Sequence, residues 1–583
     1  MNKNKELSKI FFEIADYLEI DGVSFKPYAY RKVAIVLETL KEDVGEIYRN
    51  GGLKALQEIS GVGEGLARAI EEYLKNGKIK HFEEIKKKLP LKVEELLKVE
   101  SLGPKKIKVL YQKLGVKNLK DLEKVAKAHK VAPLFGFGKK TEENILQGLE
   151  FLKRDKGRFL IQEILPIARN VLEKLKNLKE VDEISLAGSS RRRKETIGDV
   201  DILVVSKKPE KVMSFFVKLD GVEKIWAQGK TKSSVRMKEG FDMDLRVLPR
   251  ESYGSALQYF TGSKDHNIAT RKIAIEKGLK LSEYGIFKGS KQIAGKTEED
   301  VYKAIGLPYI EPELRENEGE IEAALARKLP KLITQKDIKG DLHCHSKPDE
   351  ITHLNKPKNS IEEIAKTAID LGYEYIGISD HTKFLKIDDG LDEKQLLKQA
   401  EEIKRINTRL RQGFGGQEKF TILHGCECNI LNDGSLDIKD EVLEKLDYVI
   451  AGVHSTLKME KKEMMVRIEK AMRNKNVDIL AHPTGRIVGQ RDEYQIDFDK
   501  ILKIAKETKT ILEINSSSRL DLRDFYIRRA KAEGVKMIIN TDSHKKEQLI
   551  NMEYGISQAR RGWAEKSDII NTLPVEELLK HLK

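Results

Sequence analysis

Seven short apolar segments recur through residues 339–583, and histidine or acidic residues lie at or near their carboxyl ends. The segments read KGDLHCHS, YEYIGISDHT, FTILHGCECNI, DYVIAGVHS, VDILAHP, TILEINSS and VKMIINTDSH. Buried strands that alternate with helices in this way predict a parallel α/β barrel. Because the polar side chains of such a barrel meet at the carboxyl ends of its strands, we expect the chemistry of this half of the chain to be there.

Nine of the twelve histidines lie in this half. A single histidine would more often be structural, but repeated placement after apolar strands favours a metal centre. Strand alternation puts Asp341, His343 and His345 on one face and Cys344 on the other. The candidate donors are then Asp341, His343, His345, His381, Glu427, His454, His482, Asp542 and His544. This set is able to hold two or three Zn²⁺ or Mn²⁺ ions, with carboxylates as bridges.

The three cysteines, Cys344, Cys426 and Cys428, flank these candidate donors. A zinc site built on cysteine is not expected, because strand alternation directs at least Cys344 away from the cluster. Three cysteines make no disulfide framework, which predicts a reducing cytoplasm. No run of about 18 apolar residues occurs, and the amino-terminal MNKNKELSKI lacks the apolar stretch of a signal peptide, so no membrane partner is expected.

A second site is predicted in residues 187–206, which read AGSSRRRKETIGDVDILVVS. Side chains at i and i+2 of a strand share a face, so Asp199 and Asp201 point the same way. Two adjacent carboxylates repel unless a cation lies between them, and Mg²⁺ prefers such oxygen ligands together with substrate phosphates. Gly188 and Ser189 can bring N–H groups and a hydroxyl close to a phosphate. The segment therefore predicts a site for a nucleoside triphosphate on a divalent metal.

Arg192, in the basic turn of the same segment, adds a forked hydrogen-bond donor for phosphate. Two metal ions that flank the attacking and leaving oxygens need a third carboxylate. The strand-like segment 241–249 (FDMDLRVLP) offers Asp242 and Asp244 on one face, and spacing does not choose between them. The sequence thus predicts a two-metal site and leaves its third carboxylate open.

The segments GSSRRRKETIGDVD, MDLRVLP and YFTGS resemble the palm and nucleotide-selection region of family X DNA polymerases, which include DNA polymerase beta. The resemblance places Asp199, Asp201 and Asp244 on the metal-binding triad, with Mg²⁺ or Mn²⁺ as cofactor and Asp244 deprotonating the primer 3′-hydroxyl. It implies nucleotide-binding roles for Gly188, Ser189, Arg192, Gly198, Tyr259, Phe260, Gly262, Asn267 and Arg271. In the family, YFTGS is the turn that excludes a ribose 2′-hydroxyl, and the last two positions touch the minor-groove edge of the incoming pair and template.

Three upstream segments resemble helix-hairpin-helix modules: ISGVGEGLARAI at 59–70, VESLGPKKIKVL at 99–110 and FGFGKKTEENIL at 135–146. Their glycines allow tight turns, and the N–H groups that follow can face a phosphate without reading a base. One such turn would also fit a helix C-cap, but three favour contact with the DNA backbone. The candidate contacts are Gly61, Gly63, Gly103, Lys105, Lys106, Gly136, Gly138 and Lys139. The net charge of +14 fits this partner, since residues 1–320 carry +12 of it.

The first module and its flank, FKPYAYRKVAIVLETL and GVGEGLARAIEEYL, resemble the small amino-terminal domain of the same family. In some members this domain carries a lysine that forms a Schiff base with an abasic sugar. The matching position here is Ala69, next to Arg68. Because alanine cannot form an imine and arginine stays protonated, lyase chemistry of this kind is not expected.

Residues 339–583 resemble the PHP family, named for polymerase and histidinol phosphatase. The resemblance implies a trinuclear metal phosphoesterase with Zn²⁺ or Mn²⁺, whose ligands match His343, His345, Asp349, His381, Glu427, His454, His482, Asp542 and His544. Asp349 departs from the usual Ser-Asp-Gly context, because the sequence reads PDE there. His353, His424 and His581 lie outside the pattern and are treated as ordinary residues.

The predicted fold is multidomain: amino-terminal helical helix-hairpin-helix domains, an α+β nucleotidyltransferase palm, and a distorted carboxyl-terminal α/β PHP barrel. The expected domains are 1–90 and 91–150 (helical, DNA-binding), 151–250 (palm), 251–318 (nucleotide selection), 319–338 (linker) and 339–583 (PHP). The acidic EPELRENEGE at 311–320 marks the end of the polymerase part and the linker. The patch RQGFGGQ predicts a surface loop between a long amphipathic helix and the strand KFTILHG.

These features together predict a monomeric, cytoplasmic DNA polymerase that fills short gaps in DNA repair, using dNTPs on gapped or primer-template DNA. Its PHP barrel is expected to hydrolyse phosphodiesters at 3′ ends, as a 3′ to 5′ exonuclease, or at abasic sites. Two other classes remain open. One is a nucleotidyltransferase with an RNA or small-molecule acceptor, which the hairpin modules and YFTGS disfavour. The other is a DNA-binding repair scaffold whose barrel does not catalyse, which the intact ligand set disfavours.

Overall fold

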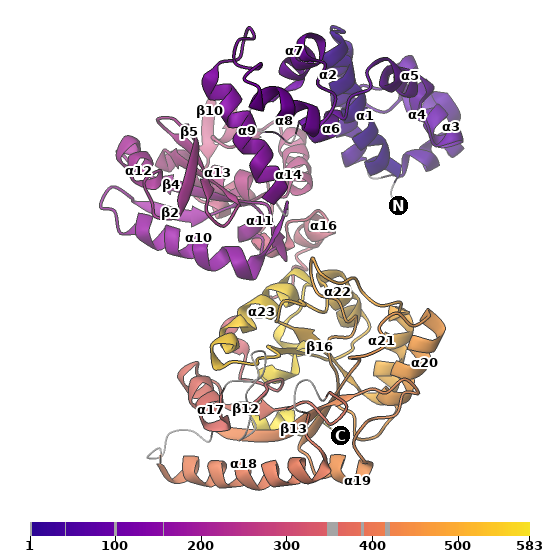
Figure 1. The fold of residues 1–583 in the computed structure, drawn as a ribbon, viewed down its shortest axis with the longest axis vertical. Helices are drawn as coiled ribbons and strands as arrows, with labels where there is room; N and C mark the ends of the chain where they lie inside the picture. The colour runs from indigo at the N-terminus through magenta and orange to yellow at the C-terminus, as the bar shows by residue number, and fades with distance from the viewer. Residues whose placement is uncertain are drawn as a thin grey trace.

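The structure is a computed structural model that describes residues 3–40, 42–97, 99, 102–154, 157–346, 359–385, 390–413 and 420–582. Figure 1 shows an upper body of helices and small sheets, coloured indigo to pink, above a barrel coloured orange to yellow. α16 (Glu320–Leu325) lies where the two bodies approach each other, near α22 (Asp524–Ala532). Among the described residues, no helix is both long and apolar enough to cross a bilayer.

The amino-terminal part is helical, as predicted. Its helices are α1 (Lys3–Asp21), α2 (Lys26–Thr39), α3 (Val44–Gln57), α4 (Glu64–Asn76), α5 (Lys80–Lys88), α6 (Val93–Leu96), α7 (Pro104–Leu114), α8 (Leu119–Lys127) and α9 (Lys139–Arg154). Their apolar faces build one continuous core that extends from Leu7 to Leu149. Tyr17 of α1 donates a hydrogen bond of 2.6 Å to the carbonyl of Leu91. The two expected helical domains therefore share one core across residue 90.

Glycines form the predicted hairpin turns in front of α4, α7 and α9. Gly61 and Gly136 have φ angles of 83° and 82°, in the left-handed region that glycine adopts without strain. Gly63 and Gly103 are the N-cap residues of α4 and α7, and neither supplies a side-chain cap. The first N–H groups of these helices therefore have no side-chain acceptor at the cap position.

The palm is a five-stranded sheet of order β2-β4-β7-β6-β5, in which β4 and β7 are parallel and the other pairs are antiparallel. Its elements are β1 (Phe159–Leu160), α10 (Ile161–Lys176), β2 (Glu183–Leu186), α11 (Gly188–Arg191), β3 (Thr196–Ile197), β4 (Asp199–Val205), α12 (Pro209–Phe216), β5 (Val222–Gln228), β6 (Lys232–Met237) and β7 (Asp242–Leu248). Met243, Leu245 and Val247 of β7 are buried in the core with α10 and α12. Alternation along β7 then turns Asp242 and Asp244 to the opposite face.

The next part is a helical layer with a three-stranded sheet of order β10-β9-β8. Its elements are η1 (Arg250–Ser252), α13 (Tyr253–Thr261), α14 (Lys264–Glu276), β8 (Lys280–Ser282), β9 (Gly285–Lys288), β10 (Lys291–Ala294), α15 (Glu298–Ala304) and η2 (Pro312–Leu314). α14 approaches the first helices of the chain, where Lys264 Nζ lies 5.4 Å from the ring centre of Phe12. The helical layer that follows the palm therefore contacts the amino-terminal helices.

The acidic segment expected to begin a polar linker is packed against other parts of the chain. Glu320 is fully buried and lies 2.7 Å from Nδ1 of His266, which is also fully buried. Glu313 accepts a hydrogen bond of 2.7 Å from Nε of Arg560 in the barrel. The sequence indicated only a polar linker here, because the partners of these carboxylates lie far away along the chain.

Seven parallel strands form the barrel in the order β11 to β17, which confirms the predicted architecture. A parallel bridge between Cys344 and Ser543 joins the ends of the first and last strands. The strands are β11 (Gly340–Asp341), β12 (Tyr375–Ile378), β13 (Thr421–Asn429), β14 (Tyr448–Gly452), β15 (Ile479–Leu480), β16 (Ile511–Asn515) and β17 (Met537–Asn540). The other elements are η3 (Gln335–Asp337), α17 (Ile361–Asp370), α18 (Glu393–Gly413), α19 (Asp440–Leu443), α20 (Lys461–Met472), α21 (Phe498–Thr508), α22, η5 (Lys546–Asn551), α23 (Met552–Arg561), η6 (Lys566–Asp568), η7 (Ile570–Thr572) and α24 (Val575–Leu578).

Aromatic rings fill the amino-terminal end of the barrel interior. Tyr448 lies across the strands and donates a hydrogen bond of 2.7 Å to the carbonyl of Leu342. A Cβ atom at Gly377 would lie 2.3 Å from Oη of Tyr448, and one at Gly425 would lie 2.4 Å from its Cζ. Only glycine leaves room for this ring at both positions, so the interior is closed at this end.

The palm and the barrel are joined by ion pairs and by apolar contacts. Arg169 of α10 makes a bidentate pair with Glu553 of α23, at 2.8 and 2.6 Å. Leu520 and Tyr554 of the barrel half belong to the palm core. The two bodies therefore contact each other through a surface ion pair and through buried apolar side chains.

Candidate active sites

Strand register brings the palm carboxylates together. β4 and β7 run parallel, and Asp201 pairs with Asp244 while Asp199 pairs with Asp242. Since side chains two residues apart share a face, all four carboxylates lie on the same side of the sheet, opposite the face that packs against α10 and α12. Gly188 lies directly beside this group, because a Cβ atom there would be 2.6 Å from Oδ2 of Asp201. A glycine turn and a carboxylate group thus face the same space.

The electrostatics of this group favour a cation. Burial raises the pKa of Asp201 to about 7, and the charges of Asp199 and Asp244 act in the same direction. Burial, followed by the charge of Asp244, also raises the pKa of Asp199. Burial and mutual repulsion both disfavour the ionised carboxylates, and a divalent ion bound between them offsets both effects. The donor set therefore fits Mg²⁺ or Mn²⁺.

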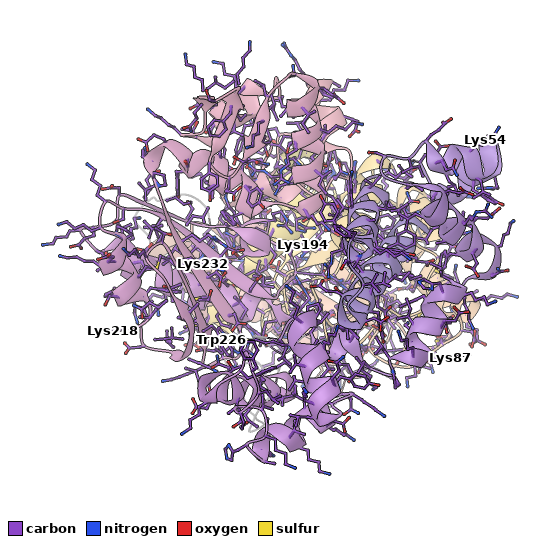
Figure 2. The ribbon with its side chains drawn as sticks, turned by 90° about the horizontal axis from the view of Figure 1, so that it is seen from above. Lys54, Lys87, Lys194, Lys218, Trp226 and Lys232 are labelled. Atoms are coloured by element: carbon purple, nitrogen blue, oxygen red, sulfur yellow. The ribbon has the colours of Figure 1, made fainter. Side chains whose placement is uncertain are left out.

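Asp242 and Asp244 have different partners, and the difference helps to choose the third carboxylate. Asp242 accepts hydrogen bonds from Nε1 of Trp226 at 2.9 Å and from Nη1 of Arg236 at 3.1 Å. Asp244 pairs at 2.9 Å with Nζ of Lys232, the partly exposed first residue of β6, which Figure 2 labels. Asp242 is therefore held by the sheet itself. Asp244 is the better candidate, because a metal ion can take the place of a partly exposed lysine.

The basic turn after Gly188 is tightly held. Arg192 donates from Nε to Glu316 at 3.0 Å and from Nη1 to the carbonyl of Thr261. Ser189 is half-buried in the same turn, and Gly198 directly precedes the strand that carries the two aspartates. The structure thus brings Arg192 and the turn around Gly262 side by side.

The YFTGS segment spans the end of α13, which finishes at Thr261. Tyr259 and Phe260 pack edge to face with ring centres 5.0 Å apart. Nδ2 of Asn267 donates a hydrogen bond of 2.7 Å to the carbonyl of Tyr259, and the guanidinium of Arg271 lies 5.1 Å from the Tyr259 ring centre. Gly262 has a φ of 68°, which favours glycine. All five residues expected to contact the nucleotide here lie in one small region.

The raised pKa of Asp201 predicts how the palm responds to pH. Because Asp201 must lose its proton to bind a cation, the affinity for Mg²⁺ should rise with pH until about 7 and then level off. The measurement is the Mg²⁺ concentration that half-saturates gap filling, from about pH 6 to about pH 8. Asp242→Asn should keep this profile. A half-saturating concentration that does not change with pH would contradict the prediction.

The second candidate site lies at the carboxyl ends of the barrel strands and is centred on Glu427 of β13. One oxygen, Oε1, lies 2.9 Å from Nε2 of His454 and 3.0 Å from Nε2 of His482. The other, Oε2, lies 3.2 Å from Nε2 of His343 and 2.8 Å from Nδ1 of His381. The two oxygens thus face two different sets of histidines, which is the geometry a bridging carboxylate needs.

Several buried nitrogen and oxygen atoms of this cluster lack hydrogen-bond partners in the described residues, and they fit metal ions. Nε2 of His343, both ring nitrogens of His345 and Oε2 of Glu427 are buried and have no hydrogen-bond partner in the described residues. Buried polar atoms are nearly always paired, so such a group calls for an additional ligand. The imidazole and carboxylate donors suit Zn²⁺ or Mn²⁺. The donor set therefore fits the metals expected from the sequence.

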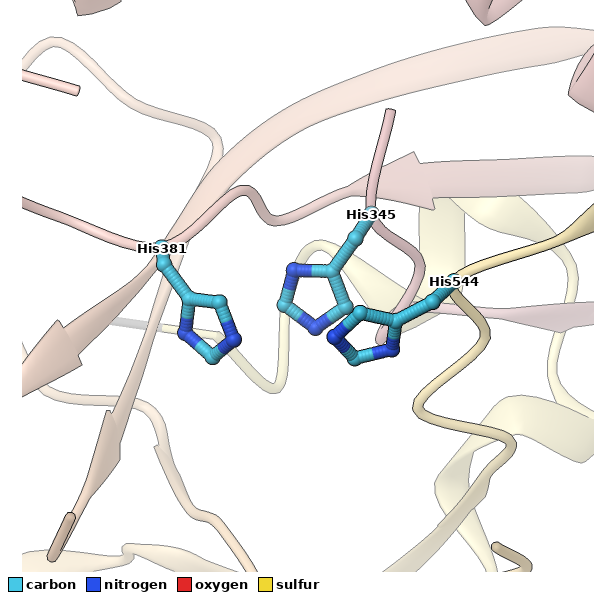
Figure 3. Close-up of side chains that lie close together, drawn as sticks. All are labelled: His345, His381 and His544. Carbon is cyan, nitrogen blue, oxygen red and sulfur yellow. The ribbon is translucent and has the colours of Figure 1, made fainter. Parts of the chain in front are cut away.

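Three groups of donors lie close enough to share an ion, with all ligand atoms of each group within 4.8 Å of one another. They are His345 with His381 and His544; His343 with His345 and Glu427; and His381 with Glu427 and His454. Figure 3 shows the first group, with the ring of His345 between those of His381 and His544. Asp542 joins them through Oδ1, which lies 3.3 Å from Nε2 of His345.

Burial and charge set the protonation of these groups. Burial opposes ionisation of Glu427, but the surrounding histidines, with His454 first, hold its pKa well below the ordinary value. Burial lowers the pKa of His454 to about 4. The backbones of His482 and Asp542 have φ angles of 28° and 53°, which non-glycine residues rarely adopt. Ionised carboxylates beside imidazoles of shifted pKa, in a backbone with rarely adopted φ angles, are typical of a functional site.

Asp341 and Asp349 differ from the other residues of the predicted set. Asp341 does not face the cluster, because its carboxylate accepts hydrogen bonds from Oγ1 of Thr541 at 2.5 Å and from the N–H of His343 at 3.0 Å. The expectation that it shares the face of the ligands is therefore wrong, and Asp341 supports the backbone instead. Asp349 lies outside the described residues. Cys344 is buried in the core behind the strands, as alternation predicts.

Three supporting residues were missed in the sequence. Glu513 of β16 is fully buried and lies 2.6 Å from Nδ1 of His343, and it also accepts from the N–H of His482 at 2.8 Å. Asn429 lies 2.8 Å from Nδ1 of His454, and Asn515 donates to Oδ2 of Asp542 at 3.1 Å. The available signal was a charged residue in the middle of the apolar segment TILEINSS.

Glu513 predicts a test of this support. A carboxylate on the far nitrogen of a metal-binding histidine fixes the ring and raises its basicity, so Glu513→Gln should weaken metal binding by about 10- to 100-fold. The measurement is the metal content of the protein after dialysis against graded chelator. Asp478→Asn is the matched control, because this buried carboxylate accepts a hydrogen bond from the N–H of Val449 at the other end of the strands. Equal metal loss in both variants would contradict the role given to Glu513.

The helical part presents its predicted DNA contacts near the glycine turns. Lys105 and Lys106 lie in the first turn of α7, where Nζ of Lys106 is 5.7 Å from the ring centre of Phe137. Ala69, at the position of the family's Schiff-base lysine, is 8% exposed on α4. Its neighbour Arg68 pairs with Glu64 at 2.8 Å. A small, buried side chain at this position provides no nucleophile.

Carboxylates on one face of the palm sheet suit two-metal nucleotidyl transfer, and the histidine cluster suits metal-dependent hydrolysis of phosphoesters. Both features are characteristic of phosphoryl-transfer enzymes. The helix-hairpin-helix domain matches residues 2–79, the SAM-like helix-hairpin-helix tandem matches 93–150, the DNA polymerase beta thumb matches 256–316 and the PHP domain matches 341–517.

Similar proteins agree with these domain matches. The DNA polymerase/3′-5′ exonuclease PolX of Bacillus subtilis (strain 168) is 38% identical over 585 residues, which covers 99% of this chain and 99% of that protein. DNA polymerase lambda of Rattus norvegicus is 24% identical over 54% of this chain and 56% of its own length. A probable phosphatase of Clostridium acetobutylicum is 37% identical over 21% of this chain and 52% of its own length. The chain belongs to the family X DNA polymerases that carry a carboxyl-terminal PHP domain, which confirms the family and the fold class predicted from the sequence.

Proposed function

We propose that this protein is a DNA-directed DNA polymerase that fills short gaps during DNA repair, and that its barrel removes nucleotides from 3′ ends as a 3′ to 5′ exonuclease. One observation carries the proposal: Asp199, Asp201 and Asp244 lie together on one face of the palm sheet beside the Gly188 turn, in a chain related along its whole length to a polymerase/exonuclease. We extend hydrolysis by the barrel to abasic sites, because the same donor set would serve any accessible phosphodiester.

In the palm, the three aspartates would hold two Mg²⁺ or Mn²⁺ ions, which lower the pKa of the primer 3′-hydroxyl and neutralise charge on the α-phosphate. Asp244 is placed to accept the proton of that hydroxyl. The backbone N–H groups of Gly188 and Ser189 would face the phosphates, and the guanidinium of Arg192 would donate paired hydrogen bonds to a phosphate. Attack in line with the leaving pyrophosphate needs no covalent enzyme intermediate.

The YFTGS turn is the proposed sugar-facing wall. Tyr259 and Phe260 pack against each other, and Asn267 holds the turn through the carbonyl of Tyr259. An ordered backbone at this position leaves no room for a ribose 2′-hydroxyl, which favours dNTPs. The glycine turns before α4, α7 and α9, with Lys105, Lys106 and Lys139, would grip the DNA backbone without reading its sequence.

In the barrel, two to three Zn²⁺ or Mn²⁺ ions would activate water and stabilise negative charge on the scissile phosphate. Glu427 would bridge two of them, since its oxygens face different histidines. Arg519 is placed to bind the phosphate: its Nε lies 3.6 Å from Oδ2 of Asp542, and its Nη1 is buried without a hydrogen-bond partner in the described residues. An arginine at this position supplies a forked donor to a phosphate held at the cluster.

Both sites are built from residues of one chain, which favours a monomer. Because the proposed substrates are gapped DNA and dNTPs, we assign the protein to the cytoplasm. The alternative of a repair scaffold with a non-catalytic barrel is disfavoured by the unpartnered donors of His343, His345 and Glu427. A nucleotidyltransferase acting on another acceptor is disfavoured by the hairpin turns and by the match to the DNA polymerase beta thumb.

The choice of the third carboxylate is tested by two conservative variants. Asp244→Asn should lower kcat/KM for dNTP incorporation on a gapped duplex by at least about 10²-fold, the scale for losing a group that stabilises transition-state charge. Asp242→Asn should have a much smaller effect, because Asp242 bonds to Trp226 and Arg236 of the sheet. Degradation of single-stranded DNA should continue in both variants. Equal losses of incorporation would show that the third carboxylate is assigned wrongly.

The barrel activity is tested on the same preparation. Glu427→Ala should lose Mn²⁺-stimulated 3′ to 5′ degradation of single-stranded DNA, because two ions lose their shared ligand. Gap filling should continue, since the palm carboxylates are on a different sheet. Elemental analysis should show less bound metal. Degradation at the wild-type rate in this variant would mean that the barrel is not the nuclease. That result would favour the alternative of a repair scaffold with a non-catalytic barrel.

A further inference from the structure

A buried arginine of the barrel reaches into the palm. Arg561 is the last residue of α23, and its side chain is 5% exposed. Its Nη1 donates to Oε1 of Glu316 at 3.0 Å and to the carbonyl of Arg192 at 3.1 Å. Its Nη2 donates to Oδ2 of Asp524 at 2.6 Å. The guanidinium thus joins the barrel directly to the backbone of the phosphate-binding turn.

Glu316 links this arginine to the side chain of Arg192. The same Oε1 accepts from Nε of Arg192 at 3.0 Å, while Oε2 lies 3.6 Å from Nζ of Lys194. Burial acts against ionisation of Glu316, but Arg192 and then Arg561 hold its pKa below the ordinary value. One ionised carboxylate is therefore shared by cations from the palm and from the barrel.

The rest of the turn is also held by the barrel. Nη1 of Arg193 lies 3.7 Å from Glu553, which pairs with Arg169 as well. Glu195 accepts a hydrogen bond of 2.8 Å from Nη2 of Arg486. Three of the four residues from 192 to 195 therefore contact barrel side chains directly. A turn fixed at several points along its length cannot change position unless the barrel contacts change too.

We propose that the barrel completes the nucleotide site of the palm, and that Arg561 is a positioning residue that sets the guanidinium of Arg192 for the triphosphate of the incoming nucleotide. The inference rests on the proposed polymerase function, in which Arg192 binds the triphosphate. Arg561 does not touch the nucleotide. It fixes the carbonyl of Arg192 and the orientation of Glu316, which in turn holds Nε of Arg192 while Nη1 bonds to the carbonyl of Thr261.

Loss of a positioning contact of this kind has a defined kinetic signature. Weaker binding of the triphosphate in both the ground state and the transition state raises KM and leaves kcat almost unchanged. Arg561→Gln in the full-length protein should raise the KM for dNTP on a gapped duplex about tenfold, the scale of one charge-assisted hydrogen bond. Arg561→Lys keeps the positive charge but lacks the planar guanidinium with its paired N–H donors, so it should give a smaller rise in the KM for dNTP. The 3′ to 5′ degradation of single-stranded DNA should stay at the wild-type rate.

Arg528→Gln is the matched control at the same junction. Arg528 donates to the carbonyl of Glu318 at 2.7 Å and lies 4.1 Å from the ring centre of Trp563, so it joins the two bodies without contacting the phosphate-binding turn. This variant should leave the KM for dNTP unchanged. If it raises the KM as much as Arg561→Gln does, the effect comes from general loosening of the junction and the inference is overturned.

Arg192→Gln separates failure of the inference from failure of the proposed function. If Arg192→Gln leaves the KM for dNTP unchanged, the triphosphate role of Arg192 is wrong. If it raises the KM but Arg561→Gln does not, only the positioning role is overturned. The double variant should have the KM of Arg192→Gln alone, because Arg561 acts through Arg192. Additive effects in the double variant, or a parallel loss of nuclease activity in Arg561→Gln, would also overturn the inference.

Discussion

Acidic and imidazole groups held together by neighbouring buried strands are the constraint on which the rest of this structure depends. In the palm, parallel pairing of β4 with β7 forces Asp201 and Asp244 to be neighbours. Burial, together with the charges of Asp199 and Asp244, raises the pKa of Asp201 from 3.8 to about 7, which corresponds to roughly 4 kcal/mol of unfavourable free energy when the carboxylate is ionised. A buried, well-packed sheet can hold such a carboxylate in place, and a divalent ion that binds to it offsets the unfavourable free energy of its ionised form. In the barrel, Glu427 is instead ionised among histidines whose nitrogens lack partners.

The sequence predicted those parts of the sites that depend on local periodicity. The i and i+2 rule placed Asp199 with Asp201, and Asp242 with Asp244, because strand alternation is set by the backbone alone. The seven apolar segments predicted the barrel because parallel strands are buried on both faces. The choice of Asp244 over Asp242 depended on the family resemblance, since the partners that hold Asp242, Trp226 and Arg236, come from neighbouring strands.

Residues whose role depends on distant partners could not be found in this way. Glu513 supports His343 across 170 positions of sequence, and its acidic side chain in an apolar segment gave only a weak signal. Asp341 was misplaced because the chain leaves regular strand geometry directly after β11, which ends at that residue, so alternation no longer holds. The acidic run at 311–320 was predicted to begin a linker, yet Glu320 is buried with His266. Composition records charge but not the partner that neutralises it.

The same limit applies to the junction between palm and barrel, where Glu316 and Arg561 are 245 positions apart. Buried ion pairs add little net stability, because desolvation offsets most of their attraction. Their geometry is nevertheless restrictive, since each charge must keep its partner or remain buried alone. A network of this kind therefore acts mainly on orientation. Because it ends on the backbone and side chain of Arg192, the barrel contributes to the shape of the palm site as well as housing its own metal-binding cluster.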